Sequence, residues 1–109
     1  MFSLFKLTNL SPAEVKAGLE NDEVLLIDVR EADEHAAEAI PGAVNIPLSR
    51  LTAEGLPELK GRKLVTHCAG GVRSKKAAEQ LFSKGVKVEH HLQGGINAWK
   101  AHGLPTRRP

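Results

Sequence analysis

The one cysteine of the chain, Cys68, opens a segment whose residue types suit a reactive thiol. An apolar run over 63–65 predicts a strand before it, and a helical pattern over 73–84 follows it. Gly70 and Gly71 permit positive φ angles, so the backbone N–H groups from 69 to 74 can turn toward the sulfur, and the helix start adds the positive end of its dipole. Both effects favour the thiolate, which is the nucleophilic form of cysteine.

Cations crowd the beginning of the helix that follows Cys68. Arg73, Lys75 and Lys76 occupy its first turn, where each basic residue costs roughly 0.3–1 kcal/mol. Folding alone favours acidic residues there, so this departure indicates a pocket for an anion. Arg73 offers a forked set of donors and a permanent charge beside the thiol. For Lys75 and Lys76, steering of anions and plain solvation on the surface both remain open.

Size and composition narrow the class of protein. The chain has 109 residues, 41% of them hydrophobic, which predicts one globular domain spanning 1–109. The 15 basic and 13 acidic residues are mixed along the chain, a pattern that argues against nucleic acid as a partner. A lone cysteine forms no internal disulfide. The N-terminal residues do not read as a signal peptide, and no apolar stretch is long enough for a membrane span, so we expect a cytoplasmic protein without a membrane partner.

Strand and helix patterns alternate along the whole chain. Ser11 and Glu14 form a capping-box pattern at the start of the first predicted helix. The order predicts an α/β fold, with a central, mostly parallel sheet and helices on both faces. Strands are expected over 4–7, 23–29, 43–46, 63–66 and 86–88, helices over 11–20, 31–37, 74–84 and 96–102, and short helical turns within 49–59. Trp99 is expected in the core.

Three segments together resemble the rhodanese-like sulfurtransferases. The first is the loop of six residues from Cys68 to Arg73, with glycine inside it and arginine at its end. The second runs from Leu26 to Arg30 and continues through Glu34 to 40–47, and the third covers 92–99 with its paired glycines and Trp99. The resemblance implies a parallel sheet of about five strands, a typical number for a sheet.

The resemblance also implies a reaction. Cys68 would be the catalytic residue, taking sulfane sulfur from thiosulfate or a persulfide donor and passing it from its own persulfide to cyanide or a thiol, including that of a protein acceptor. It implies no metal and no cofactor. We expect the thiol to be reachable from solvent. The substrate-binding residues would be Ala69, Gly70, Gly71, Val72, Arg73 and Ser74.

Other functions compete with this interpretation. A cysteine-dependent phosphatase or arsenate reductase carries a similar loop, although a tetrahedral oxyanion needs more room than the six residues from Cys68 to Arg73 provide. A sulfur carrier or binding module for a partner protein is the other alternative. The chain itself does not separate carrier from enzyme, because both hold a persulfide.

Several residues near the predicted site have a structural explanation as well. Asp28 and Arg30 are supporting candidates that hold the active loop, or an internal ion pair. His67 precedes the thiol, and strand neighbours point to opposite faces, so it need not touch the sulfur. The family commonly has Gly-His where this chain has Glu38-Ala39, which leaves the packing of that turn open.

Overall fold

The computed structural model describes residues 5–109 and contains one sheet of five strands, all of whose pairings are parallel. The strand order is β1-β5-β4-β2-β3. The strands are β1 (Thr8–Leu10), β2 (Val24–Asp28), β3 (Val44–Asn45), β4 (Lys63–His67) and β5 (His90–Leu92). The predicted α/β class and its parallel sheet are therefore confirmed.

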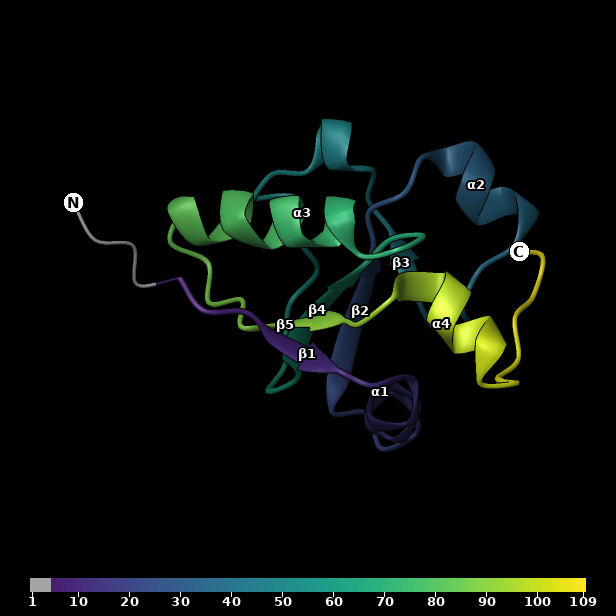
Figure 1. Ribbon diagram of the computed structural model, residues 1–109. Coiled ribbons are helices and arrows are strands. Elements are labelled where there is room, and N and C mark those ends of the chain that lie inside the picture. Colours follow the sequence, from purple (N-terminus) through teal and green to yellow (C-terminus); the bar gives the residue numbers. More distant parts are fainter. Residues whose placement is uncertain (1–4) are drawn as a thin grey trace.

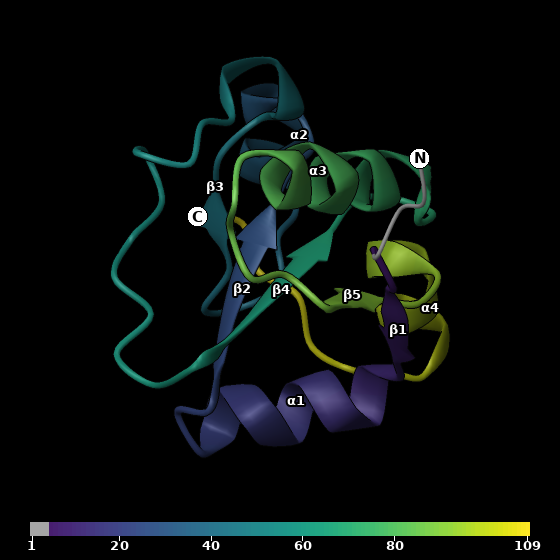
Figure 2. The same ribbon diagram turned by 90° about the vertical axis from the view of Figure 1, so that its left-hand side faces the viewer.

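Helices cover both faces of this sheet (Figures 1 and 2). On one face, α3 packs over Leu25, Ile27 and Leu64, and on the other α1 and α4 pack over Leu26 and Val65. Alternate residues of β2 and β4 thus pack into opposite cores, which is why β2 begins with four consecutive apolar residues. The helices are α1 (Pro12–Glu20), α2 (Ala32–Ala37), α3 (Val72–Ser83) and α4 (Gly95–Ala101), with a 3-10 turn η1 (Leu48–Arg50) between β3 and β4.

The first and last strands lie later in the chain than their apolar patterns predict. The first strand is Thr8–Leu10 rather than 4–7, and Leu4 lies outside the described residues. Phe5 and Leu7 pack against the core on the α3 side without belonging to the sheet. The prediction mistook side chains that cover the core for a strand, because a short apolar alternation is common to both.

The alternation of Val86 and Val88 is misleading for a different reason. The amide of Val86 donates to the carbonyl of Leu81 at 3.0 Å and so closes the end of α3, which removes it from the sheet. Val88 is buried in the core on the α3 side. The strand itself is His90–Leu92. It was not predicted because two of its three residues are histidines and only one is apolar.

The turn that departs from the family pattern is tied to the C-terminal segment. Glu38 accepts hydrogen bonds from Lys100 and Thr106, each at 2.7 Å. Ala39 forms an isolated antiparallel bridge with Arg107. These contacts hold the end of α2 beside the last residues of the chain (Figure 1), so Glu38-Ala39 fastens the C-terminal segment where the common pattern has Gly-His.

The carboxyl ends of the strands gather at one edge of the sheet. Asp28 at the end of β2 lies in register with His67 at the end of β4, and Thr66 lies in register with His91 of β5. Cys68 follows β4 directly, so it lies at this edge, where parallel α/β sheets bind their ligands. None of the helices in residues 5–109 combines the length and apolarity needed to cross a membrane.

Candidate active site

Backbone N–H groups converge on the sulfur of Cys68. The amide of Gly71 donates to Sγ at 3.0 Å and the amide of Ser74 at 3.3 Å. Gly71 adopts a φ of 113° immediately before α3, a conformation that L side chains rarely adopt. The glycine therefore lets the chain turn sharply around the sulfur and enter the helix with its amide still directed inward.

These donors stabilise the ionised thiol. Burial raises the pKa of Cys68, but hydrogen bonds from the amide and hydroxyl of Ser74 and from the amides of Gly71 and Gly70 outweigh it, so the pKa lies below its ordinary value. A hydrogen bond to a charged acceptor is stronger than one to a neutral acceptor, which is why this cradle favours the anion. Two of the loop amides that the sequence analysis expected to turn inward, those of Gly71 and Ser74, thus donate to the sulfur.

The first N–H groups of α4 donate hydrogen bonds to two carbonyl groups of the cysteine loop. Ile96 donates to the carbonyl of Cys68 at 2.9 Å, and Asn97 donates to the carbonyl of Ala69 at 3.1 Å. In a trans peptide the carbonyl and the following N–H point in opposite directions. A carbonyl of Ala69 turned toward α4 thus directs the N–H of Gly70 toward the sulfur. The loop and the beginning of α4 lie side by side in both views (Figures 1 and 2).

Gly95 makes this approach possible. A Cβ atom built on it would meet the carbonyl oxygens of Cys68 and Ala69, the latter at 2.5 Å, and its φ of 60° is also unfavourable for a side chain. Sequence reasoning included Gly95 only as part of a family motif. Nothing in the sequence indicates that Gly95 contacts Cys68 and Ala69, which lie more than twenty-five residues before it.

The expectation that Cys68 is open to solvent is wrong for this conformation. The residue is 1% exposed, because the loop backbone folds over the sulfur to bring its amides within hydrogen-bonding distance. The cover is thin: Gly70 is exposed, and a Cβ built on it meets nothing within 4 Å. Val72 is also exposed on the rim, at 70%.

Arg73 is held by Glu34, a residue that the sequence analysis included only in a motif. The guanidinium Nη1 and Nη2 donate to the two carboxylate oxygens of Glu34 at 2.7 and 3.0 Å. Hydrogen bonding to Glu34 raises the pKa of Arg73, while the same contact lowers that of Glu34. The arginine thus links the cysteine loop to α2. The sequence analysis expected its guanidinium to donate to the sulfur, whereas these donors bind Glu34.

Asp28 and Arg30 form a buried ion pair at the end of β2. Arg30 donates through Nε and Nη2 to the Asp28 carboxylate, with Nη2 at 2.7 Å from Oδ2, and His35 Nδ1 lies 2.9 Å from the same oxygen. Burial raises the pKa of Asp28, but these contacts and the charge interaction with His67 lower it overall. The geometry favours the bracing interpretation of the pair.

His67 connects this pair to the cysteine backbone. Its Nδ1 lies 3.1 Å from the carbonyl oxygen of Cys68, and its Nε2 lies 3.7 Å from Oδ1 of Asp28. Burial lowers the pKa of His67, so the ring is neutral near pH 7, and a carbonyl partner requires the proton on Nδ1. His67 thus contacts the backbone of Cys68 and leaves the sulfur to the loop amides.

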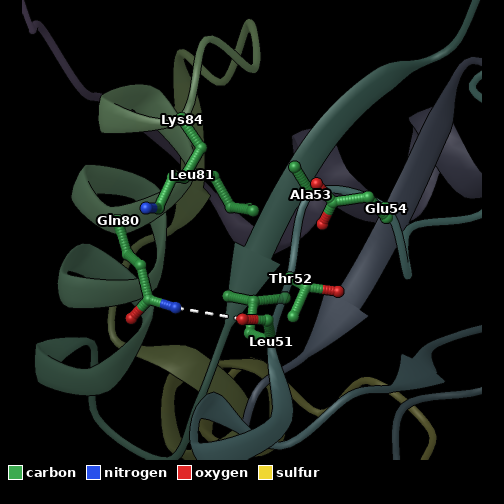
Figure 3. Close-up of a pocket in the computed structure, with 7 residues that line it drawn as sticks. All are labelled: Leu51, Thr52, Ala53, Glu54, Gln80, Leu81 and Lys84. Atoms are coloured by element: carbon green, nitrogen blue, oxygen red, sulfur yellow. Dashed lines mark hydrogen bonds between the residues drawn. The ribbon is translucent and has the colours of Figure 1, made fainter.

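A groove beside α3 lies apart from this arrangement (Figure 3). It opens between α3 and the segment after η1, where Gln80 Nε2 donates to the carbonyl of Leu51 at 3.0 Å. None of its lining residues belongs to the cysteine loop. The groove is therefore separate from the cysteine loop, and it is lined by Leu51, Thr52, Ala53, Glu54, Gln80, Leu81 and Lys84.

Comparison with known proteins assigns the family. The profile of the rhodanese-like domain matches residues 11–102, so the chain belongs to the rhodanese-like domain family. It resembles the solved structure of a thiosulfate sulfurtransferase from Pseudomonas aeruginosa with a TM-score of 0.81 and 27% identity, covering 94% of this chain and 20% of that one.

Curated relatives differ in length and in kind. An uncharacterized protein from Synechocystis is 42% identical over 89% of this chain and 54% of its own length. A sulfurtransferase from Allochromatium vinosum is 36% identical, covering 83% of this chain and 84% of that protein. A tRNA uridine(34) hydroxylase from Cytophaga hutchinsonii is also 36% identical, over 81% of this chain and 30% of that protein. The chain thus spans about half or less of two of these relatives.

Replacing Asp28 tests the bracing role of the buried pair. Asp28→Ala leaves the Arg30 guanidinium buried without its carboxylate, and we expect a loss of about 3–5 kcal/mol in the free energy of unfolding. Glu20→Ala is the control, since it removes the exposed Lys16–Glu20 pair and should cost about 0.5 kcal/mol or less. Urea denaturation measures both, and equal midpoints for Asp28→Ala and the parent protein would contradict the bracing role.

A pair of glycine substitutions tests the contact between α4 and the loop. Gly95→Ala places a methyl group against two loop carbonyls, so it should slow alkylation of Cys68 by iodoacetamide and lower the melting temperature. Gly103→Ala shares the positive φ, at 71°, but meets no atom within 4 Å, and should cost only about 1–2 kcal/mol. If both variants keep the parent alkylation rate, the α4 contact does not set the reactivity of the thiol.

Proposed function

We propose that this protein is a sulfurtransferase that carries sulfane sulfur as a persulfide on Cys68, with thiosulfate or a related anion as donor and a thiol or cyanide as acceptor. The observation that carries the proposal is the set of N–H donors from Gly70, Gly71 and Ser74 around one sulfur atom. A site of this kind stabilises an anionic sulfur before and after transfer. Membership of the rhodanese-like family and the sulfurtransferase relative point the same way.

The first half-reaction is a displacement at sulfur. The Cys68 thiolate attacks the outer sulfur of thiosulfate, a new S–S bond forms to Cys68, the original S–S bond breaks, and sulfite leaves with its electron pair. The charge that was on the thiolate then lies on the terminal sulfur of the persulfide. The amides of Gly70, Gly71 and Ser74 are the donors available to it.

The second half-reaction regenerates the thiolate. Cyanide or a thiolate acceptor attacks the terminal persulfide sulfur, the S–S bond to Cys68 breaks, and its electron pair returns to Cys68 Sγ. The residues of the loop take no proton in this step, and their task is to hold the charge. Ala69 and Val72 shape the rim, while Arg73, fixed on Glu34, leaves its remaining N–H donors for an anionic donor.

Access to the sulfur requires the loop to shift. Cys68 is 1% exposed, so a donor must displace part of the backbone that covers it. Gly70, whose surroundings are open, is the position at which the cover yields most easily.

Phosphate or arsenate chemistry fits this site less well. The amides that would bind the oxygens of a tetrahedral anion instead lie within 3.0–3.3 Å of Sγ, in a loop of six residues. A role as a sulfur carrier or binding module for a partner protein is the second candidate. It is favoured by the tRNA uridine(34) hydroxylase from Cytophaga hutchinsonii, in which the region similar to this chain makes up 30% of the protein and is joined to further sequence.

Intact-mass measurement tests the persulfide directly. After incubation with thiosulfate we expect a mass gain of one sulfur atom, lost again on addition of cyanide with release of thiocyanate. Cys68→Ser should abolish both the gain and the thiocyanate while keeping the melting temperature, since its side chain differs by a single atom. A mass gain in Cys68→Ser, or turnover of an aryl phosphate without any thiocyanate, would refute the proposal.

A further inference from the structure

An ion pair at the end of the cysteine loop joins Arg73 to Glu34 of α2. Arg73 immediately precedes Ser74, whose amide lies 3.3 Å from Cys68 Sγ. Its Nη1 and Nη2 donate to Oε1 and Oε2 of Glu34 at 2.7 and 3.0 Å. The two side chains are 35% and 36% exposed, so small molecules in solution can reach the pair. The reaction as written above gives Arg73 a part in binding the sulfur donor and gives Glu34 no part beyond fixing Arg73.

The carboxylate of Glu34 is held from two directions. Its Oε1 accepts a hydrogen bond from the amide of Glu31 at 3.0 Å, which completes the capping box of α2, and the same oxygen accepts from Arg73. Hydrogen bonding to Arg73 lowers the pKa of Glu34, so the carboxylate is ionised in neutral solution. Glu34 therefore keeps both its position and its negative charge beside Arg73.

The stability of the fold gives only a weak reason for this pair. An ion pair whose partners are exposed to this degree contributes little to the free energy of unfolding. An acidic residue in the first turn of α2 is favourable, but Asp33 already supplies one. What the pair changes is the charge of the site, because Arg73 is the one cation of the segment 68–74 and Glu34 cancels it.

The neighbouring cations do not restore a positive charge at the loop. Arg30, whose Nη1 lies 3.5 Å from the carbonyl oxygen of Glu34, is paired with the buried carboxylate of Asp28. Lys75 and Lys76 are exposed on α3, where water and salt screen their charges, and neither joins an ion pair among residues 5–109. At the loop itself, an approaching anion meets a cation whose charge is already matched.

Sulfane-sulfur donors differ in the charge that they bring to such a site. Thiosulfate is a dianion, whereas a thiosulfonate, in which an alkyl group replaces one oxygen, is a monoanion. In both donors the outer sulfur must approach Cys68, where the amides of Gly71 and Ser74 are the nearby N–H groups. The second charge of thiosulfate lies on the far end of the molecule, and there repulsion by Glu34 offsets attraction by Arg73.

We propose that Glu34 is a specificity-determining residue, which cancels the charge of Arg73 and so favours sulfur donors of the monoanionic thiosulfonate class over the thiosulfate dianion. The inference deepens the proposed function and rests on it for its biological use. With such a donor the Cys68 thiolate attacks the outer sulfur, the S–S bond to the sulfonyl group breaks, and a sulfinate leaves with the electron pair. The remaining N–H donors of Arg73 are available to the sulfonyl oxygens.

The rate of sulfur loading tests the proposal with two matched donors, thiosulfate and methanethiosulfonate, which differ by one negative charge. Intact mass gives a rate constant for each donor, and the ratio of the thiosulfate rate to the methanethiosulfonate rate is compared between variants, so that the intrinsic reactivities of the donors cancel. Glu34→Gln removes the charge and keeps a side chain that suits a capping box. We expect this ratio to rise about tenfold, the effect of one charge acting over several ångströms. An unchanged ratio would overturn the proposal.

Two control variants separate the charge of Glu34 from a structural effect. Glu34→Asp keeps the charge, so the ratio should stay that of the parent protein even if both rates fall. Glu20→Gln makes the same change in net charge at the exposed Lys16–Glu20 pair of α1, which precedes the beginning of β2 and so lies away from the edge that carries Cys68. A distorted loop would slow both donors alike. A tenfold rise in either control would contradict the proposal.

Alkylation of Cys68 keeps this test independent of the proposed function. Iodoacetate and iodoacetamide also differ by one negative charge and transfer no sulfur, and in Glu34→Gln the ratio of their rates should likewise rise about tenfold. That rise in a protein that gains no sulfur from either donor would support the role of Glu34 while refuting the sulfurtransferase. Sulfur loading with unchanged ratios would do the reverse.

A second variant serves if Glu34→Gln does not fold. Arg73→Gln leaves the charge of Glu34 without its partner, so both ratios should fall, because the more highly charged reagent of each pair is repelled more strongly. Ratios equal to those of the parent protein would overturn the proposal.

Discussion

The site depends on the orientation of two peptide groups after β4. The carbonyls of Cys68 and Ala69 are bound by the first amides of α4, and this fixes the direction of the N–H groups that follow them. Without that constraint the glycines of the loop would sample many conformations, since glycine loses more conformational freedom on folding than other residues. The N–H groups fixed in this way are those of Ala69 and Gly70, and the amides of Gly71 and Ser74, which donate to Cys68 Sγ, follow in the same loop. The surroundings of the sulfur are therefore set by backbone geometry, with side chains in supporting positions.

Much of the fold could be predicted because local and global signals agree. The capping box at Ser11 and Glu14 forms as its pattern indicates, and the run Val24–Asp28 is buried on both faces as a central parallel strand should be. The terminal strands could not be predicted in the same way. The strands β1 and β5 have three residues each, which is too short to show a periodic pattern. Their positions depend on the pairing of β1 with β5 and of β5 with β4.

The site could be predicted only where its residues are adjacent in sequence. Cys68 and the loop amides come from one segment, and the structure brings them together as expected. The contacts of Arg73 with Glu34 and of Ser74 with His91 join different elements, and nothing in the sequence marks them. The burial of Cys68 was missed because sequence patterns identify a turn but not what the turn covers.

The contact between α4 and the cysteine loop links the reactivity of this thiol to the completeness of the fold. The two segments are made at different times during synthesis, so a nascent or unfolded chain has a cysteine with ordinary acidity. In the folded chain the amides converge on the sulfur, and the loop that α4 contacts also buries it. The donors that lower the pKa of Cys68 therefore depend on contacts between segments that are far apart in the sequence.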